Sequence, residues 1–336
     1  MMTPWVVTIL LIVLFIPQLY YLKKTNDYKS IRNGSKFFVR NSRDLEDHTE
    51  VYLTNTDGHD IFVRIYEADN PKAIVQIVHG MAEHSYNYLN FIKYLVASGY
   101  TVVAHDHRGH GKSISEKYPN GYMSLSEELV DDTYAVNTFM RQTHPGLKVC
   151  MIGHSMGSMI ARMYVQSYDD TIEKLVLSGT VERSNIAGVG LFFANIISFF
   201  SRGYQPSIMT PLLPGGEDDD TWISYNMDNV IEKRNDPMRI KTFLERYVAV
   251  IIDLNKKMAK VSRYNTYNPN LSILSVTGED DIVTGSTKGL ESTFEILEKA
   301  GYSHIENIVY PHMKHEILNE KENEIVYNDI LDFLDE

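Results

Sequence analysis

The sequence predicts an α/β protein with a mostly parallel central sheet and helices on both of its faces. Short apolar runs recur along the 336-residue chain, at Ile74–Val78, Thr101–Ala104, Val149–Ile152, Leu175–Leu177, Ile273–Val276 and Ile308–Tyr310. Longer segments with helical spacing separate these runs, as in Met156, Met159, Ile160 and Met163. Continuously apolar strands that alternate with helices are typical of a parallel sheet buried on both faces. Such sheets bind ligands at the carboxyl ends of their strands.

Composition excludes several other classes of protein. The chain is 43% hydrophobic and 23% charged, which is an ordinary balance for a globular protein. Its formal net charge of −12 argues against broad nucleic-acid binding, which needs a basic surface. Cys150 is the one cysteine, so an intrachain disulfide framework and a cysteine-rich zinc site are both excluded. We expect Cys150 to be a small core residue, because it lies within an apolar run.

The N-terminus predicts a membrane anchor. Pro4–Leu22 has no charged side chain, and as a helix it would be about 28 Å long, close to the hydrocarbon thickness of a bilayer. Trp5 and Tyr20-Tyr21 lie at its two ends, where interfacial aromatic residues are expected. The alternative is a cleaved signal peptide, which needs a basic start and a small-residue cleavage site. The chain has neither, and Leu22-Lys23-Lys24 follows, so we expect an uncleaved single-pass anchor in the cell membrane.

Charge is distributed unevenly around this span. Residues 1–40 contain six basic residues and one acidic residue, giving +5, whereas the rest of the chain carries −17. The positive-inside rule therefore places the C-terminal body in the cytoplasm. We expect residues 1–40 to form the anchor, with its span at about 4–22, followed by a basic linker.

The body is predicted to be one core with an insertion. Glu50–Thr54 and Asp60–Glu67 are predicted to form a hairpin around Asp57-Gly58. The first part of the core is then residues 41–180 and the second part is residues 266–336.

Residues 181–265 lack a convincing strand and are predicted to form a helical cap over the carboxyl edge of the sheet. They contain two helical segments, Leu191–Phe200 and Pro237–Ile252, and an acidic loop, Glu217–Asp220, which we expect to be solvated. The alternative is that the two helices only pack against the core.

A nucleophile motif follows the run Val149–Ile152. The sequence Gly153-His154-Ser155-Met156-Gly157 fits G-x-S-x-G and leads into a predicted helix. A serine hydroxyl is a weak nucleophile unless it is exposed, close to a base and near an oxyanion site. The sharp strand-to-helix turn would expose Ser155, and the backbone N–H of Met156 would point to where an oxyanion forms.

Two further motifs also follow predicted strands. They are His79-Gly80-Met81-Ala82-Glu83-His84-Ser85 and Asp106-His107-Arg108-Gly109-His110-Gly111-Lys112-Ser113. With G-x-S-x-G, they make the chain resemble the serine α/β-hydrolases of the monoacylglycerol lipase and lysophospholipase group, which overlap with the serine aminopeptidase (S33-like) proteins. The resemblance covers roughly Asp57 to the C-terminus and implies an α/β-hydrolase fold. The cap, which sets substrate choice, matches poorly.

The resemblance implies a Ser–His–Asp triad in the chain order Ser, Asp, His. Ser155 would be the nucleophile, and Met81, like Met156, would give a backbone N–H to the oxyanion. The pattern Gly-x-x-Asp after the run Ile273–Val276 implies Asp281 as the acid, with Asp280 as the adjacent alternative. The last strand is followed by His312 and His315. The family histidine precedes a glutamate such as Glu316, which favours His315, with His312 as the alternative.

The other motif residues are expected to line the site or to brace its loops. They are His79, Gly80, Glu83, His84, Asp106, Arg108, His110 and His154. Asp106, Arg108 and His110 would brace their turn through hydrogen bonds and a charge pair. His105–His110 resembles a zinc motif superficially but has Gly109 where an aspartate is needed, and Gly111-Lys112-Ser113 lacks the first glycine of a P-loop. The expected chemistry needs no metal and no organic cofactor.

The cap helix favours a lipid substrate. Leu191–Phe200 is apolar nearly all round, so it is either fully buried or faces something apolar. Leu191, Phe192, Phe193 and Ile196 are therefore the expected contacts for an acyl chain that enters from the bilayer. We predict hydrolysis of a single-acyl lipid ester, a monoacylglycerol or a lysophospholipid. The alternatives are a hydrolase of small soluble esters, thioesters or peptides, and a membrane-bound, non-catalytic lipid-binding protein with the same fold.

Overall fold

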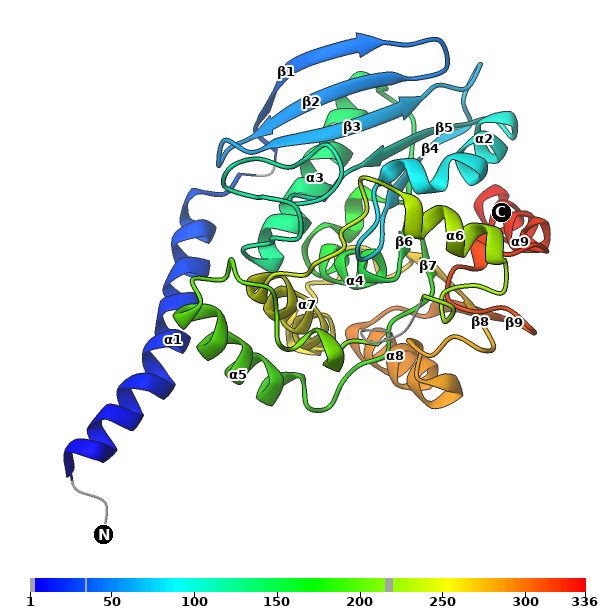
Figure 1. Cartoon of the computed structure of the whole chain (residues 1–336). Coiled ribbons are helices and arrows are strands. Elements are labelled where there is room, and N and C mark those ends of the chain that lie inside the picture. The colour runs from blue at the N-terminus through cyan, green and yellow to red at the C-terminus, as the bar shows by residue number, and fades with distance from the viewer. Residues whose placement is uncertain (1–3, 34, 215–219) are drawn as a thin grey trace.

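A nine-stranded sheet forms the centre of the protein in the computed structural model, which describes residues 4–33, 35–214 and 220–336 (Figure 1). The strand order is β1-β2-β3-β5-β4-β6-β7-β8-β9. The pairs β1–β2, β2–β3 and β3–β5 are antiparallel. All later pairs in this order, from β5–β4 to β8–β9, are parallel. The predicted α/β class and mostly parallel sheet are confirmed.

The elements have the following bounds. The strands are β1 Phe37–Asp44, β2 Thr49–Asn55, β3 Asp60–Tyr66, β4 Ala73–Val78, β5 Tyr100–His105, β6 Val149–His154, β7 Lys174–Ser178, β8 Ser272–Gly278 and β9 His304–Tyr310. The α-helices are α1 Pro4–Ile31, α2 Leu89–Ala97, α3 Ser126–Thr143, α4 Met156–Tyr168, α5 Ala187–Phe200, α6 Met227–Asn235, α7 Glu245–Met258, α8 Ser286–Ala300 and α9 Asn323–Asp335.

Both faces of the parallel part of the sheet are buried, which explains why its strands are continuously apolar. In β4, Ile74 and Val78 belong to one core, together with residues of α3, α4 and α7. Val75 and Ile77 point into the other core, together with residues of α2 and α9. Every strand of this part ends near the same edge, so the loops that follow β4, β6, β8 and β9 come together there.

The predicted bounds of the N-terminal anchor and linker differ from the observed bounds of α1 and β1. Residues Phe37–Arg40 were predicted to belong to a linker, but they form the first half of β1. This strand pairs only with β2 and is almost entirely exposed, so its sequence has no alternation of apolar and polar residues. Helix α1 continues past Leu22 to Ile31.

Helix α1 is, among the described residues, the one helix long and apolar enough to cross a membrane by length and composition. It extends away from the body at its N-terminal end, and its later turns run beside α5 (Figure 1). Gln18 donates from Nε2 to the carbonyl oxygen of Phe192 at 2.9 Å and accepts from Asn195 at 3.0 Å. The Tyr21 hydroxyl lies 2.8 Å from that of Ser198. These polar pairs fix α1 on α5.

The chain between β7 and β8 contains α5, α6 and α7. No strand occurs in the described parts of residues 181–265, the range predicted as a helical insertion. The second predicted helix, Pro237–Ile252, is wrong at its start, because α7 begins at Glu245. The residues before it bond to distant loops instead, as Ile240 does to the carbonyl oxygen of Ala82. Glu217–Asp219 of the predicted acidic loop lie outside the described residues.

Candidate active site

Ser155 occupies a sharp turn between β6 and α4. Its backbone has φ 53° and ψ −118°, a strained conformation for a residue with a side chain. The flanking glycines allow this turn to approach its neighbours closely. A Cβ atom at Gly157 would lie 2.0 Å from the carbonyl oxygen of Val78, and one at Gly153 would lie 2.5 Å from that of Gly157. The two glycines of G-x-S-x-G are therefore required by packing.

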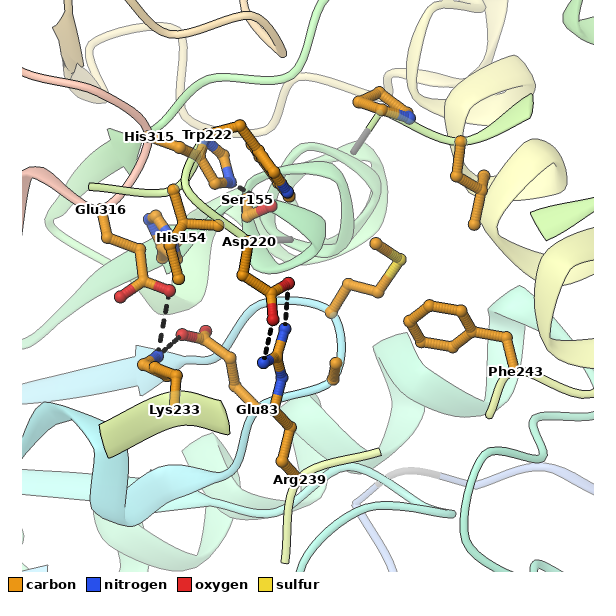
Figure 2. Close-up of a pocket in the computed structure, with 15 residues that line it drawn as sticks. Glu83, His154, Ser155, Asp220, Trp222, Lys233, Arg239, Phe243, His315 and Glu316 are labelled. Atoms are coloured by element: carbon orange, nitrogen blue, oxygen red, sulfur yellow. Dashed lines mark hydrogen bonds and ion pairs between the residues drawn. The ribbon is translucent and has the colours of Figure 1, made fainter. Parts of the chain in front are cut away.

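Ser155, His315 and Asp281 are joined by hydrogen bonds. The Ser155 Oγ lies 2.7 Å from His315 Nε2 (Figure 2). On the other side of the ring, His315 Nδ1 lies 2.9 Å from Asp281 Oδ2. Asp281 also accepts from the backbone N–H of Val283 at 2.8 Å, which holds the carboxylate in place. The structure thus brings together the three residues that were predicted as a triad.

The two alternatives for the triad lie elsewhere. Asp280 is exposed, and its carboxylate accepts from the Tyr225 hydroxyl at 3.0 Å. His312 is also exposed. Neither residue lines the pocket beside Ser155.

The surroundings of His315 suit a general base. Burial alone would lower the pKa of His315, but the Asp281 carboxylate and its hydrogen bond outweigh burial and raise the pKa above its usual value of 6.5. The Trp222 ring stacks on the imidazole, with ring centroids 5.2 Å apart. His154 is buried beside it, and burial lowers the pKa of His154 to about 4, so this second imidazole is neutral.

The predicted oxyanion donors are positioned next to Ser155. Met156 is the first residue of α4, and Met81 lies in the loop after β4 and lines the same pocket. Within the described residues, neither backbone N–H donates a hydrogen bond. The loop after β4 comes close to the serine, because a Cβ atom at Gly80 would lie 3.1 Å from that of Ser155. Two donors from different loops can therefore converge on one oxygen.

A buried ion-pair cluster connects the loops around this site. Lys233 of α6 contacts Glu83, which follows β4, and lies 3.1 Å from Glu316, which follows His315 (Figure 2). Glu83 also accepts from the N–H of Gly80 at 2.9 Å and from the Tyr88 hydroxyl at 2.6 Å. Burial alone would lower the pKa of Lys233, but the two carboxylates raise it to about 12. Lys233 therefore stays charged, and it connects the loop after β4 and the loop after β9 to the insertion.

The remaining predicted motif residues hold the loops rather than face the pocket. Asp106 accepts from the backbone N–H groups of Ser85 and Lys112, each at 2.8 Å. Arg108 is fully buried and forms a two-point ion pair with Asp132, at 2.6 and 2.7 Å.

The three histidines of these loops that were predicted to line or brace the site are also engaged. His79 accepts from the N–H of His107 at 2.9 Å, His110 lies 2.9 Å from the Tyr247 hydroxyl, and His84 lies 2.6 Å from an Asp236 carboxylate oxygen. Of the predicted site-lining set, Glu83 and His154 line the pocket.

The insertion contributes to the pocket through residues that were not predicted. They are Leu213, Pro214, Asp220, Trp222, Ile223, Lys233, Arg239 and Phe243. Asp220, which was expected to be in a solvated loop, forms a two-point ion pair with Arg239 at 2.6 and 2.7 Å. No sequence motif marks these residues, and the local sequence around Lys233 and Trp222 gave no signal.

The expected acyl-chain contacts on α5 lie elsewhere in the structure. Leu191, Phe192, Phe193 and Ile196 do not line the pocket beside Ser155. Phe192 packs against Phe15 of α1 instead, with ring centroids 6.4 Å apart, and Phe193 is exposed. Contact with α1 covers part of the apolar surface of α5, whereas Val189 and Phe200, like Phe193, stay exposed.

A serine at a strained strand-to-helix turn, bonded to a histidine at the carboxyl edge of a parallel sheet, defines a serine hydrolase of the α/β-hydrolase fold. Comparison with known proteins agrees with this class. Residues 69–322 match the family described as serine aminopeptidase, S33. Because the match spans more than half of the chain, the protein belongs to this family, and it is a serine hydrolase of the lipase and esterase type.

Three similar proteins illustrate the relationship. A monoacylglycerol lipase of Mycolicibacterium smegmatis is 26% identical over 269 residues, which cover 79% of this chain and 89% of the relative. The human monoglyceride lipase is 28% identical over 213 residues, 63% of this chain and 67% of the relative. The crystal structure of a carboxyl esterase from Bacillus coagulans superimposes with a TM-score of 0.77 at 26% identity, covering 87% of this chain and 99% of the esterase.

Proposed function

We propose that the protein hydrolyses esters of single-acyl lipids, such as a monoacylglycerol or a lysophospholipid, at a membrane surface. One observation carries the proposal: Ser155, His315 and Asp281 are joined by hydrogen bonds, and Ser155 and His315 line a pocket. The similarity to monoacylglycerol lipases supports a lipid ester as the substrate.

The reaction proceeds through an acyl-enzyme. His315 accepts the Ser155 proton as Oγ attacks the ester carbonyl carbon, while Asp281 holds the imidazole and stabilises its charged form. The N–H groups of Met81 and Met156 bind the oxyanion of the tetrahedral intermediate. His315 then protonates the leaving alcohol. Water, activated by the same histidine, releases the fatty acid from Ser155.

The size of the pocket favours a second candidate substrate. The cavity beside Ser155 has a volume of about 80 Å³, whereas ligand pockets are typically about 300–1,000 Å³. A short acyl group fits this space directly. A long chain requires side chains that line the cavity, such as Trp222 and Phe243, to move aside. Small esters are therefore the alternative substrates.

We further propose that α1 anchors the protein in the membrane with its body in the cytoplasm. The apolar segment before Leu22 and the basic residues after it support this orientation. A reporter fused at the C-terminus should be active inside the cell, and activity only outside would overturn the orientation.

Two measurements test the catalytic proposal. A fluorophosphonate probe should label the wild-type protein and not Ser155→Ala. Absence of wild-type labelling would favour a non-catalytic lipid-binding protein. Hydrolysis rates are then compared for glycerol esters from acetyl to long-chain acyl groups. A clear preference for long chains supports the lipid substrate, and a preference for acetyl esters supports the alternative.

A further inference from the structure

A second cavity lies at the base of the anchor, apart from the pocket beside Ser155. It has a volume of about 360 Å³, and it is lined by the later turns of α1, by α5 and by α7. These three helices lie together in Figure 1, where α5 runs between α1 and α7. None of the residues that line it lines the Ser155 pocket. The proposed hydrolysis therefore gives this cavity no role.

The cavity is basic although the body of the protein is acidic. Its lining contains two carboxylates, Glu127 and Asp253, and five cations, namely Lys29, Arg246, Lys256, Lys257 and Arg263. Lys257 is bonded to both carboxylates, at 2.9 Å and 2.5 Å. Glu127 also lies 3.6 Å from Lys29 and 4.0 Å from Arg263. Five cations against two carboxylates still leave the lining a formal charge of +3, so the cavity attracts an anion.

Arg246 is the clearest unbalanced charge. Its side chain is buried, and the whole residue is 3% exposed. Its Nε donates to the carbonyl oxygen of Ser124 at 2.7 Å, Nη1 donates to Asn195 Oδ1 at 2.9 Å, and the guanidinium lies 3.8 Å from the Tyr21 ring centroid. No carboxylate among the described residues pairs with it. A buried cation without a counter-ion is costly, and a bound anion would offset that cost.

The lining also contains apolar side chains. They are Leu22, Leu191 and Phe192. Along α1 the cavity spans the level where the uncharged segment ends and Lys23 begins, which is the expected depth of lipid headgroups if α1 is an anchor. A site lined by both cations and apolar side chains fits a molecule that joins an anionic group to a hydrocarbon chain.

We propose that this cavity binds the phosphate-bearing headgroup of an anionic phospholipid. Basic pockets beside membrane helices on the cytoplasmic side bind such headgroups through the same chemistry. The proposal rests on the membrane-anchor part of the proposed function. Arg246, Lys256 and Arg263 would face the phosphate. Leu22 and Phe192 would contact the first acyl carbons.

The test is a calorimetric titration of the full-length protein in detergent. The ligands are short-chain phosphatidylglycerol, phosphatidylcholine with the same chains, and inorganic phosphate. We expect phosphatidylglycerol to bind more tightly than the other two. Lys256→Gln with Arg263→Gln should weaken phosphatidylglycerol binding roughly 30-fold, about fivefold for each lost cation. Lys288→Gln with Lys321→Gln removes the same charge from exposed positions outside the cavity and should bind as the wild type does.

Equal binding of phosphatidylglycerol to the wild type and the cavity variant would overturn the proposal. Inorganic phosphate that binds as tightly as the lipid would overturn the assignment to a lipid. The melting temperature reports whether the double variant folds. If it does not fold, Lys256→Gln alone, at an exposed position, should still weaken binding about fivefold. Flotation of the wild type with phosphatidylcholine liposomes tests the anchor separately, and failure to float would overturn the anchor whatever the titration shows.

Discussion

Replacing Lys233 with methionine is expected to destabilise the fold strongly. The side chains of Lys233, Glu83 and Glu316 are only 6%, 8% and 7% exposed, so the two carboxylates depend on this one ammonium group as their counter-ion. Methionine keeps much of the length of the lysine side chain and removes its charge. Loss of one partner of a buried ion pair costs about 3–5 kcal/mol. We expect a loss of that size near neutral pH, because both carboxylates would remain buried.

The loss should shrink as the pH falls. Burial raises the pKa of Glu83, but in the wild type Lys233 outweighs burial and holds that pKa well below its usual value. The wild-type contribution of Glu83 is therefore present above the unfolded pKa and is lost as the pH falls below it. Without Lys233, burial raises the pKa of Glu83 above the unfolded value. The folded variant then takes up a proton as the pH falls, and its deficit decreases.

Urea unfolding of the full chain in detergent, at about pH 7 and about pH 5, measures both effects. Lys288→Met is the matched control, because Lys288 is exposed on α8 and its replacement should change stability little. Adding Glu83→Gln and Glu316→Gln to Lys233→Met should restore much of the loss, since no buried charge would remain. The reasoning is refuted if Lys233→Met loses less than about 1 kcal/mol at neutral pH, the size of a surface pair.

The remaining predictions concern the proposed triad and one buried histidine. Asp281→Asn should lower kcat about 10⁴-fold, because His315 loses its orienting acceptor, whereas Asp280→Asn should stay close to the wild type in the same ester assay. The wild-type kcat/KM should fall as the pH is lowered, with a midpoint above 6.5, because Asp281 outweighs burial in setting the pKa of His315; a midpoint below 6.5 would contradict this. His105→Leu should raise the free energy of unfolding by about 1–3 kcal/mol, because neither ring nitrogen of buried His105 has a hydrogen-bond partner among the described residues. A variant that is no more stable than the wild type in urea unfolding would contradict this prediction.

The parts of the fold that depend on local sequence were predictable. Buried parallel strands require continuous apolar runs, so each run, such as Val149–Ile152, marked a strand within a few residues of its observed bounds. The triad residues follow strand ends, which predicted that they meet at one edge of the sheet. The family resemblance was needed to choose Asp281 over Asp280 and His315 over His312. Strand β1 escaped prediction because an exposed edge strand leaves no apolar pattern.

The rest of the site depends on contacts between residues far apart in the chain. Lys233 meets Glu83 across 150 residues, and Trp222 meets His315 across more than 90, so no local motif could pair them. The expectation that α5 lines the pocket beside Ser155 was wrong for a related reason. Its apolar residues fit an acyl-chain contact as well as a helix contact, and only the structure shows that Phe192 packs on Phe15.

The left-handed backbone of Ser155 implies a conflict between stability and activity at one position. A non-glycine residue held in such a conformation costs about 1–3 kcal/mol, whereas glycine adopts positive φ without a Cβ penalty. Ser155→Gly should therefore make the protein more resistant to heat while abolishing ester hydrolysis. Resistance to heat and ester hydrolysis therefore make opposite demands on the residue at position 155.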